Sequence, residues 1–208
     1  MGTVFFQGSF TSIPVQVSVE YPPVALTGSS TVISGQAYGN GTYTTTQGTQ
    51  FNASFAAWYV FDKTTNNAGT SRWATNGGYN AGTGAYTGAL AQTAGYSGDW
   101  VQITMPAAIV VTSYSVTNYY NSFSAVIANT PVSWVILGTN DAVPSSGGSW
   151  TVIDTQTNIV WSPTNAFSTQ TFNVTGASSF AAYRMVVTKM GNGLDGNLSF
   201  QELRFFGY

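Results

Sequence analysis

The chain has 208 residues, enough for one compact domain with a core of its own. Only 6% of them are charged, five Lys or Arg against seven Asp or Glu, and there is neither His nor Cys. Five scattered cations cannot replace the counterions around a nucleic acid, so a nucleic-acid partner is excluded. Without Cys and His, disulfide scaffolds, thiolate or imidazole metal sites and imidazole catalysis are excluded as well.

The N-terminal residues carry no Lys or Arg before their first apolar positions, unlike a secretory signal. No apolar stretch approaches the roughly 20 residues of a membrane helix. We therefore expect neither a signal peptide nor membrane insertion. A formal charge of −2 leaves a nearly neutral surface, which suits contacts with neighbouring proteins or with sugars.

Strand patterns dominate the chain, and clusters of Gly, Asn, Ser and Thr separate them, while helix patterns are nearly absent. Pro106 is expected to end one of the strands. The pattern predicts an all-β sandwich of roughly eight or more strands. Strands are predicted over Ile13–Val19, Val101–Met105, Val110–Tyr120, Val132–Leu137, Thr151–Ile153, Thr171–Val174, Tyr183–Thr188 and Leu198–Phe206.

Two segments fall outside this pattern. Residues 1–25 contain a strand-like run that ends at Tyr21-Pro22-Pro23, and we interpret them as an N-terminal arm before a single domain at 26–208. Residues 66–97 are rich in Gly, Asn, Thr and Tyr and show little periodicity. A loop of this length in a compact domain is usually functional or held by its neighbours.

Three segments resemble one known family in their residues, order and spacing. They are Tyr59–Lys63 followed by Ser71–Trp73, then Gly98–Pro106, then the stretch from Pro131 to Gly207. Together they resemble the discoidin-like domain, the coagulation-factor C-domain type of the galactose-binding-like superfamily. The resemblance implies a jelly-roll β-sandwich that is not an enzyme. Such domains bind glycans, lipid head groups or proteins through loops at one end.

A narrower likeness concerns Pro22–Thr27, Ala37–Tyr43 and Tyr79–Gly88. These segments resemble a discoidin-like variant in virion proteins of large nucleocytoplasmic DNA viruses. The likeness implies location in the virion as a minor capsid, vertex or surface component. It also implies capsid or virion proteins as partners, and a homo-oligomer, because shells are built from symmetric copies.

The resemblance also implies a structural calcium ion. Asp62, Ser71 and Glu202 match the positions that hold calcium in many glycan-binding relatives. Calcium takes six to eight oxygen ligands, so backbone carbonyls would have to complete the shell. In the alternative interpretation, Asp62 caps a turn and Glu202 pairs with Lys63 or Arg72. For Arg184 and Arg204 we expect Glu202, Asp62 or carbonyls as partners, since a buried charge needs one.

Aromatic and amide side chains in the long loop region form a candidate glycan or protein contact, because rings stack on sugars and amides bind hydroxyls. Core roles are the alternative, favoured for Trp73, Trp100, Trp134 and Trp150. Asp141, Asp154 and Asp195 lie beside turn residues, which favours turn carboxylates over a glycosidase pair. The candidate contact residues are Trp73, Asn76, Tyr79, Asn80, Tyr86 and Tyr96.

Two hypotheses for function remain. The first is a non-enzymatic structural protein of a large DNA virus particle that contacts its neighbours in the shell. The second is a glycan-binding module for adhesion or host recognition. Both predict an all-β, jelly-roll β-sandwich of the galactose-binding-like type.

Overall fold

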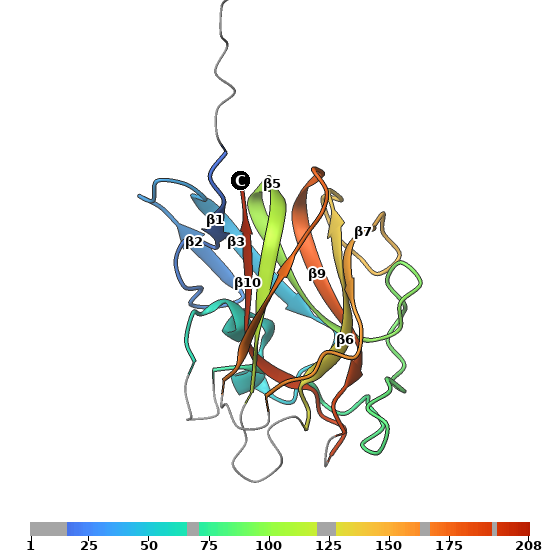
Figure 1. The fold of residues 1–208 in the computed structure, drawn as a ribbon. Coiled ribbons are helices and arrows are strands. Elements are labelled where there is room, and N and C mark those ends of the chain that lie inside the picture. The colour runs from blue at the N-terminus through green and yellow to red at the C-terminus, as the bar shows by residue number, and fades with distance from the viewer. Residues whose placement is uncertain (1–15, 66–70, 120–127, 163–166, 193–194) are drawn as a thin grey trace, which may run out of the picture.

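The computed structural model describes residues 16–65, 71–119, 128–162, 167–192 and 195–208 (Figure 1). None of the helices in these ranges is long and apolar enough to cross a membrane. The described elements are β1 (Val19–Tyr21), β2 (Ser30–Ile33), β3 (Gly41–Gln47), the 3-10 helices η1 (Ala53–Phe55) and η2 (Ala57–Phe61), β4 (Trp73–Ala74), β5 (Asp99–Asn118), β6 (Pro131–Thr139), β7 (Thr151–Gln156), β8 (Thr169–Asn173), β9 (Ser179–Met190) and β10 (Ser199–Gly207).

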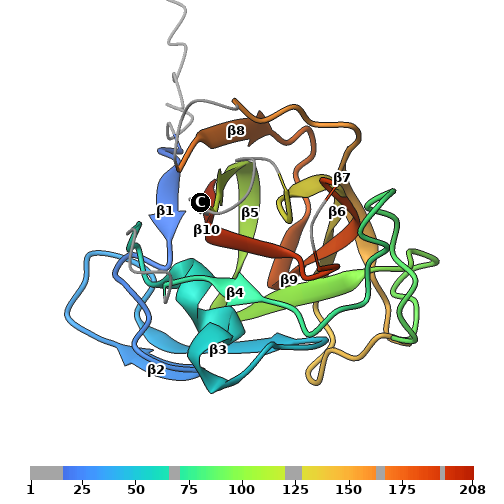
Figure 2. The same cartoon turned by 90° about the horizontal axis from the view of Figure 1, so that it is seen from below.

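Two antiparallel layers share one strand. One layer has the order β2-β3-β5-β9-β6-β7. The other has the order β1-β10-β5-β8, with the short β4 also paired to β10. Figures 1 and 2 show the two layers from the side and from below. The predicted all-β sandwich is confirmed.

β5 is the strand that belongs to both layers. Its first half pairs with β3 and β9, and its second half pairs with β10 and β8. The register shifts between Thr104 and Ile109, and Pro106 lies exposed in this interval. The prediction that a strand ends at Pro106 was wrong. The proline sits at the irregular crossing, where its missing N–H costs no ladder hydrogen bond.

The core between the layers is built from large rings whose polar atoms are satisfied. The Trp134 indole donates to the Tyr114 hydroxyl (2.9 Å), which in turn donates to the Asp154 carboxylate (2.5 Å). The Trp161 indole donates to the Pro131 carbonyl (2.6 Å). Burying a large apolar side chain stabilises the fold by about 1.5–3 kcal/mol, provided that polar atoms find partners.

The two Thr-rich strands β2 and β3 were not predicted. They alternate between exposed and buried side chains, as in the burial of Tyr43 and Thr45 between exposed Thr42, Thr44 and Thr46. The predicted strands from residue 132 onward are present as β6 to β10. Strand pairing therefore adds two strands, β2 and β3, that the hydrophobic pattern did not indicate.

Most of the predicted N-terminal arm lies outside the described residues, which begin at 16. Its described end contributes β1, which pairs with β10 through Val19, Glu20 and Tyr21. The strand predicted over Ile13–Val19 is thus described only at its end. β1 lies at the edge of the layer formed with β10.

Candidate functional site

The candidate site is a cleft at the end of the sandwich where β5 begins. The opposite end carries the bend of β5 and the C-terminus, since Gly207 pairs with Val111 (Figure 1). The cleft has a volume of about 380 Å³. Its walls come from the turn after β3, the segment after β4, the long loop and the first residue of β5. The lining residues are Thr49, Asn76, Gly77, Gly78, Tyr86, Gly88, Ala89, Leu90 and Asp99.

Asp99 forms the inner wall of the cleft, with only 1% of its surface exposed. Its Oδ1 accepts hydrogen bonds from the backbone N–H groups of Thr49 (3.0 Å) and Trp100 (2.8 Å), and its Oδ2 accepts from the Thr49 hydroxyl. Burial raises the pKa of Asp99, and these hydrogen bonds oppose that rise. The carboxylate is therefore held in one orientation.

Thr49 ties the walls of the cleft together. Besides its contacts to Asp99, its carbonyl accepts from the Trp73 indole (2.9 Å), and its hydroxyl accepts from the Asn76 backbone N–H (3.2 Å). The next residue, Gly77, donates its N–H to the Asn197 side chain (2.6 Å). This places Asn76 at the exposed mouth of the cleft on a backbone that is fixed on both sides.

Tyr79 and Tyr86 lie side by side in an edge-to-face contact, 5.2 Å between ring centroids. Tyr79 is buried, donates its hydroxyl to the Val187 carbonyl (2.8 Å) and accepts from the Asp99 N–H (3.2 Å). Burial raises its pKa well above the ordinary value. Tyr86 is half-buried and lines the cleft, and its hydroxyl accepts from the Leu90 N–H (3.2 Å). The buried Tyr79 ring therefore packs against Tyr86 on the side away from solvent.

Tyr79 and the other three predicted contact residues do not line the cleft themselves. Trp73 is buried and packs edge-to-face on Phe200, so its ring is part of the core. Asn80 is exposed, but its side chain accepts from the N–H groups of Gly82 and Thr83 (3.0 Å each) and so holds a turn. Tyr96 packs on the outer face of the β6–β9 layer.

Thr49 and Asp99 were missed because their role depends on a contact between residues 50 positions apart. The signal available in the sequence was the polar Asp99 at the start of a strong strand pattern. Asn76 and Tyr86 were predicted, and the structure brings these two together in the cleft.

Arg184 departs from its predicted partners. It is 1% exposed, and its guanidinium donates to the Gln102 side-chain oxygen (2.7 and 3.1 Å) and to the Thr93 hydroxyl (2.8 Å). The guanidinium also stacks between Trp100 (3.7 Å) and Trp150 (4.5 Å), which are half-buried outside the main core. Burial lowers its pKa to about 10. Ring faces and an amide oxygen replace the expected carboxylate.

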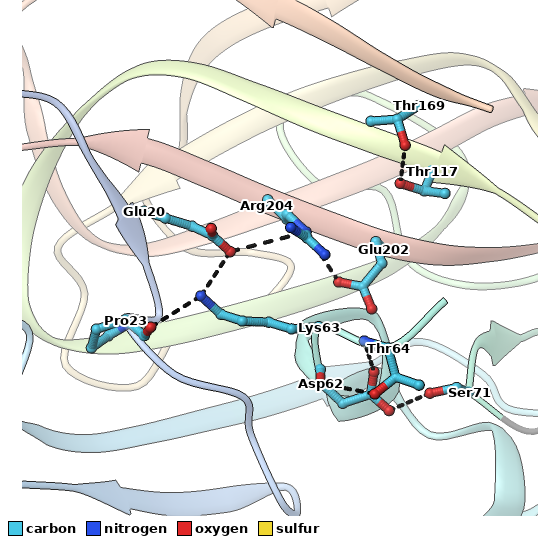
Figure 3. A network of polar contacts seen from close by, with 10 residues as sticks. All are labelled: Glu20, Pro23, Asp62, Lys63, Thr64, Ser71, Thr117, Thr169, Glu202 and Arg204. Carbon is cyan, nitrogen blue, oxygen red and sulfur yellow. Dashed lines mark hydrogen bonds and ion pairs between the residues drawn. The ribbon is translucent and has the colours of Figure 1, made fainter. Parts of the chain in front are cut away.

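The predicted calcium residues Asp62, Ser71 and Glu202 lie together at the loop end (Figure 3). The Ser71 hydroxyl donates to the Asp62 carboxylate, whose other oxygen accepts from the Thr64 N–H (2.8 Å). Asp62 therefore also caps a turn, as in the alternative interpretation. Lys63 pairs with Glu20 (2.8 Å) rather than with Glu202.

Glu202 is fully buried, and neither of its carboxylate oxygens makes a hydrogen bond of good geometry, although Thr64 N–H, Asp62 and the Arg204 guanidinium lie near it. Burial, and to a smaller extent the nearby Asp62 carboxylate, raise its pKa to about 9 against the opposing effect of Arg204 at 3.5 Å. A buried carboxylate without a well-aligned donor, near a second carboxylate that a serine hydroxyl contacts, fits a hard cation such as calcium. No group of three or more Asp, Glu, His or Cys side chains occurs in the described residues, so carbonyls or water would have to complete the shell.

No family model matches the chain, and no curated protein matches it. Solved structures do. A fucolectin from striped bass (Morone saxatilis) serum has a TM-score of 0.53 at 15% identity, over 80% of this chain and 47% of that one. A GH31 CBM32-2 bound to GalNAc has a TM-score of 0.52 at 13% identity, over 78% and 95%. The SusE-like protein BT2857 has 0.52 at 17% identity, over 76% and 60%. The fold is thus the galactose-binding-like jelly roll.

Proposed function

We propose that the chain is a glycan-binding module whose site is the cleft at the loop end. The observation that supports this most directly is the lining of the cleft: an aromatic ring, an exposed amide and a fixed carboxylate meet there, without a cation. Two proteins of the same fold are named for sugar binding, the fucolectin and the module bound to GalNAc. Rings, amides and carboxylates are the groups that recognise sugar rings and hydroxyls.

Each cleft residue has a separate task in this proposal. Tyr86 contacts the apolar face of a sugar ring, and Tyr79 keeps it in place. Asn76 donates to and accepts from hydroxyls at the mouth. Asp99 accepts from a hydroxyl at the inner wall, and Thr49 fixes the orientation of its carboxylate. Because these groups are already held by other contacts, little ordering entropy opposes binding.

We propose calcium as a structural partner of the site, held by Asp62, Ser71 and Glu202. Ser71 and Asn76 belong to one short segment, which includes β4. The Thr75 hydroxyl accepts from the Leu198 N–H (2.9 Å) and fixes that segment to the chain just before β10. An ion at Ser71 would anchor the start of the segment whose end lines the cleft.

Glycan-array binding followed by calorimetry tests the proposal. We expect weak, calcium-sensitive binding to a subset of neutral glycans, and Tyr86→Ala and Asn76→Ala should each weaken it at least tenfold, about 1.4 kcal/mol. Val143→Ala is a matched control, because Val143 is exposed and does not line the cleft. Absence of binding across a broad array by a folded protein would contradict the proposal.

The lining favours binding over hydrolysis. Glycosidases use two carboxyl groups about 5–9.5 Å apart. Among the described lining residues, Asp99 is the single acidic one, and all the hydrogen bonds that its carboxylate accepts come from Thr49 and Trp100.

A role in the shell of a large DNA virus, with capsid proteins or further copies as partners, stays a prediction from the sequence. The compared structures concern the fold and carry no information on a particle. Co-sedimentation of the protein with purified particles would support it, and a monomer that never co-sediments would contradict it.

A further inference from the structure

A second hollow lies beside the end of β3. β2 pairs with β3 only as far as Thr44, so residues 45–47 extend beyond it, and η1 and η2 follow alongside (Figure 2). The groove has a volume of about 440 Å³, within the usual range for small-molecule sites of about 300–1,000 Å³. Two alanines complete a lining of polar residues and one ring: Ser29, Thr45, Thr46, Gln47, Gln50 and Trp58.

Trp58 is held in a defined position in this groove. Its ring stacks on Tyr59 with 3.7 Å between centroids and 27° between planes. The start of η2 is tied to β3, because the Gln47 side-chain oxygen accepts from the Ala57 N–H (3.1 Å). Trp58 is half-buried, so part of the indole remains accessible on a rigid support.

The polar groups of the groove retain capacity for hydrogen bonds. Gln47 donates to the side-chain oxygen of Gln50, which leaves the Gln50 amide as a donor. The Thr45 hydroxyl has no hydrogen-bond partner among the described residues, although Thr45 is only 5% exposed. An unpaired buried hydroxyl lowers stability, and a group bound beside Thr45 in the groove would supply its missing partner.

None of the residues that line the groove is ionisable. Anionic, cationic and phosphorylated ligands would lack a counter-charge there. Hydroxyl groups, primary amides and an indole face are instead the chemistry that recognises a neutral sugar ring. A loop of a partner protein could also pack on the indole of Trp58. Its backbone N–H groups, however, would need hydrogen-bond acceptors, and the lining has few that are fixed in position.

We propose that the groove at Trp58 is a second binding site for a neutral saccharide, with the indole as stacking platform and Gln50 and Thr45 as hydrogen-bonding groups. The inference extends the proposed glycan-binding function, but it stands on separate contacts. The turn after β3 separates the two sites, since Gln47 and Gln50 line the groove and Thr49 lines the cleft. Two sites on one chain would raise the avidity for a clustered glycan surface.

Two-dimensional NMR of the full chain, titrated with millimolar galactose, N-acetylgalactosamine, glucose, mannose and fucose, tests this inference. The indole N–H signal of Trp58 is assigned by its loss in Trp58→Phe. We expect it to shift saturably with at least one of these sugars. Trp58→Ala and Gln50→Ala should each raise Kd at this site at least tenfold. In these variants the Kd is measured from the shifts of the backbone amide signals of Thr46 and Ala53.

The amides of Asn76 and Gly77 report on the cleft separately. Shifts at the cleft with none at Trp58, Thr46 or Ala53 would overturn the second site and leave the proposed function intact. Shifts at Trp58 that persist in Asn76→Ala would support the second site even if the cleft stayed silent. If Trp58→Ala does not fold, Gln50→Ala decides, because its side chain lies at the surface of the groove. An unchanged Kd in that variant would overturn the inference.

Discussion

At the scale of single residues, the position of Tyr86 depends on the absence of two side chains. A Cβ added at Gly88 would lie 2.5 Å from the Tyr86 hydroxyl, and one at Gly78 would lie 3.2 Å from its ring. Gly78 also has a φ of +95°, which side chains rarely adopt. The Tyr86 ring can therefore occupy its position in the cleft only because Gly78 and Gly88 have no side chains.

We predict that Gly88→Ala displaces the Tyr86 ring and weakens glycan binding at least tenfold, about 1.4 kcal/mol. Isothermal titration measures the affinity. Gly147→Ala is the matched control, because a Cβ there meets nothing within 4 Å. Equal affinities of the two variants would show that the ring position does not matter for binding.

Asp99 should give the protein an unusual acid response. Its pKa is raised above the ordinary value of 3.8, mainly by burial, so the folded state takes up a proton at a higher pH than the unfolded state. The contribution of Asp99 to stability therefore grows as the pH falls through its folded pKa toward 3.8. We predict that the wild type gains stability relative to Asp99→Asn on acidification. Denaturant unfolding of both proteins across this range measures the difference, and a constant or opposite difference would contradict it.

Glu202 is the residue on which calcium should act. With a chelator present, we predict that Glu202→Gln unfolds at the same or a higher temperature than the wild type, because one of two facing carboxylates is removed. With calcium, the wild type should gain stability and Glu202→Gln should not, since a ligand stabilises the state that binds it. Thermal unfolding under both conditions measures this, with Asp141→Asn as a control outside the cluster. An equal calcium shift in Glu202→Gln would rule out Glu202 as a ligand.

At the scale of elements, the sequence predicted what local patterns determine. Strands rich in Val, Ile and aromatic residues, such as β6 and β9, follow from their composition. β3 was missed because all of its seven residues except the buried Tyr43 are Gly, Thr or Gln, and pairing with β5 decides its state. The same limit applies to the site: Asn76 and Tyr86 were found by residue type, whereas Asp99 depends on a distant contact with Thr49.

Arg184 of β9 joins β5, through Trp100 and Gln102, to the loops that carry Thr93 and Trp150. A guanidinium is planar and a lysine ammonium is not, so exchange between the two is not conservative here. We predict that Arg184→Lys lowers the free energy of unfolding by about 2–3 kcal/mol, measured by denaturant unfolding. Arg204→Lys, whose side chain is partly exposed, should cost under about 1 kcal/mol. Similar losses in both variants would contradict a special role of the Trp100–Arg184–Trp150 stack.

At the scale of the whole molecule, the few charges concentrate on structural tasks. Glu20, Lys63, Glu202 and Arg204 form one network (Figure 3). Arg184 is buried between two tryptophan rings. Much of the described surface is consequently neutral and polar. Such a surface favours recognition by shape, stacking and hydrogen bonds over long-range attraction.

The crossing of β5 from one layer to the other has a consequence for the cooperativity of unfolding. Each half of β5 is hydrogen-bonded on both sides, to β3 and β9 in one layer and to β10 and β8 in the other. Neither layer can melt while leaving its share of this strand in place. We predict a single cooperative transition in calorimetry, with equal calorimetric and van't Hoff enthalpies. Two resolved transitions would mean that the layers behave as independent units despite the strand that they share.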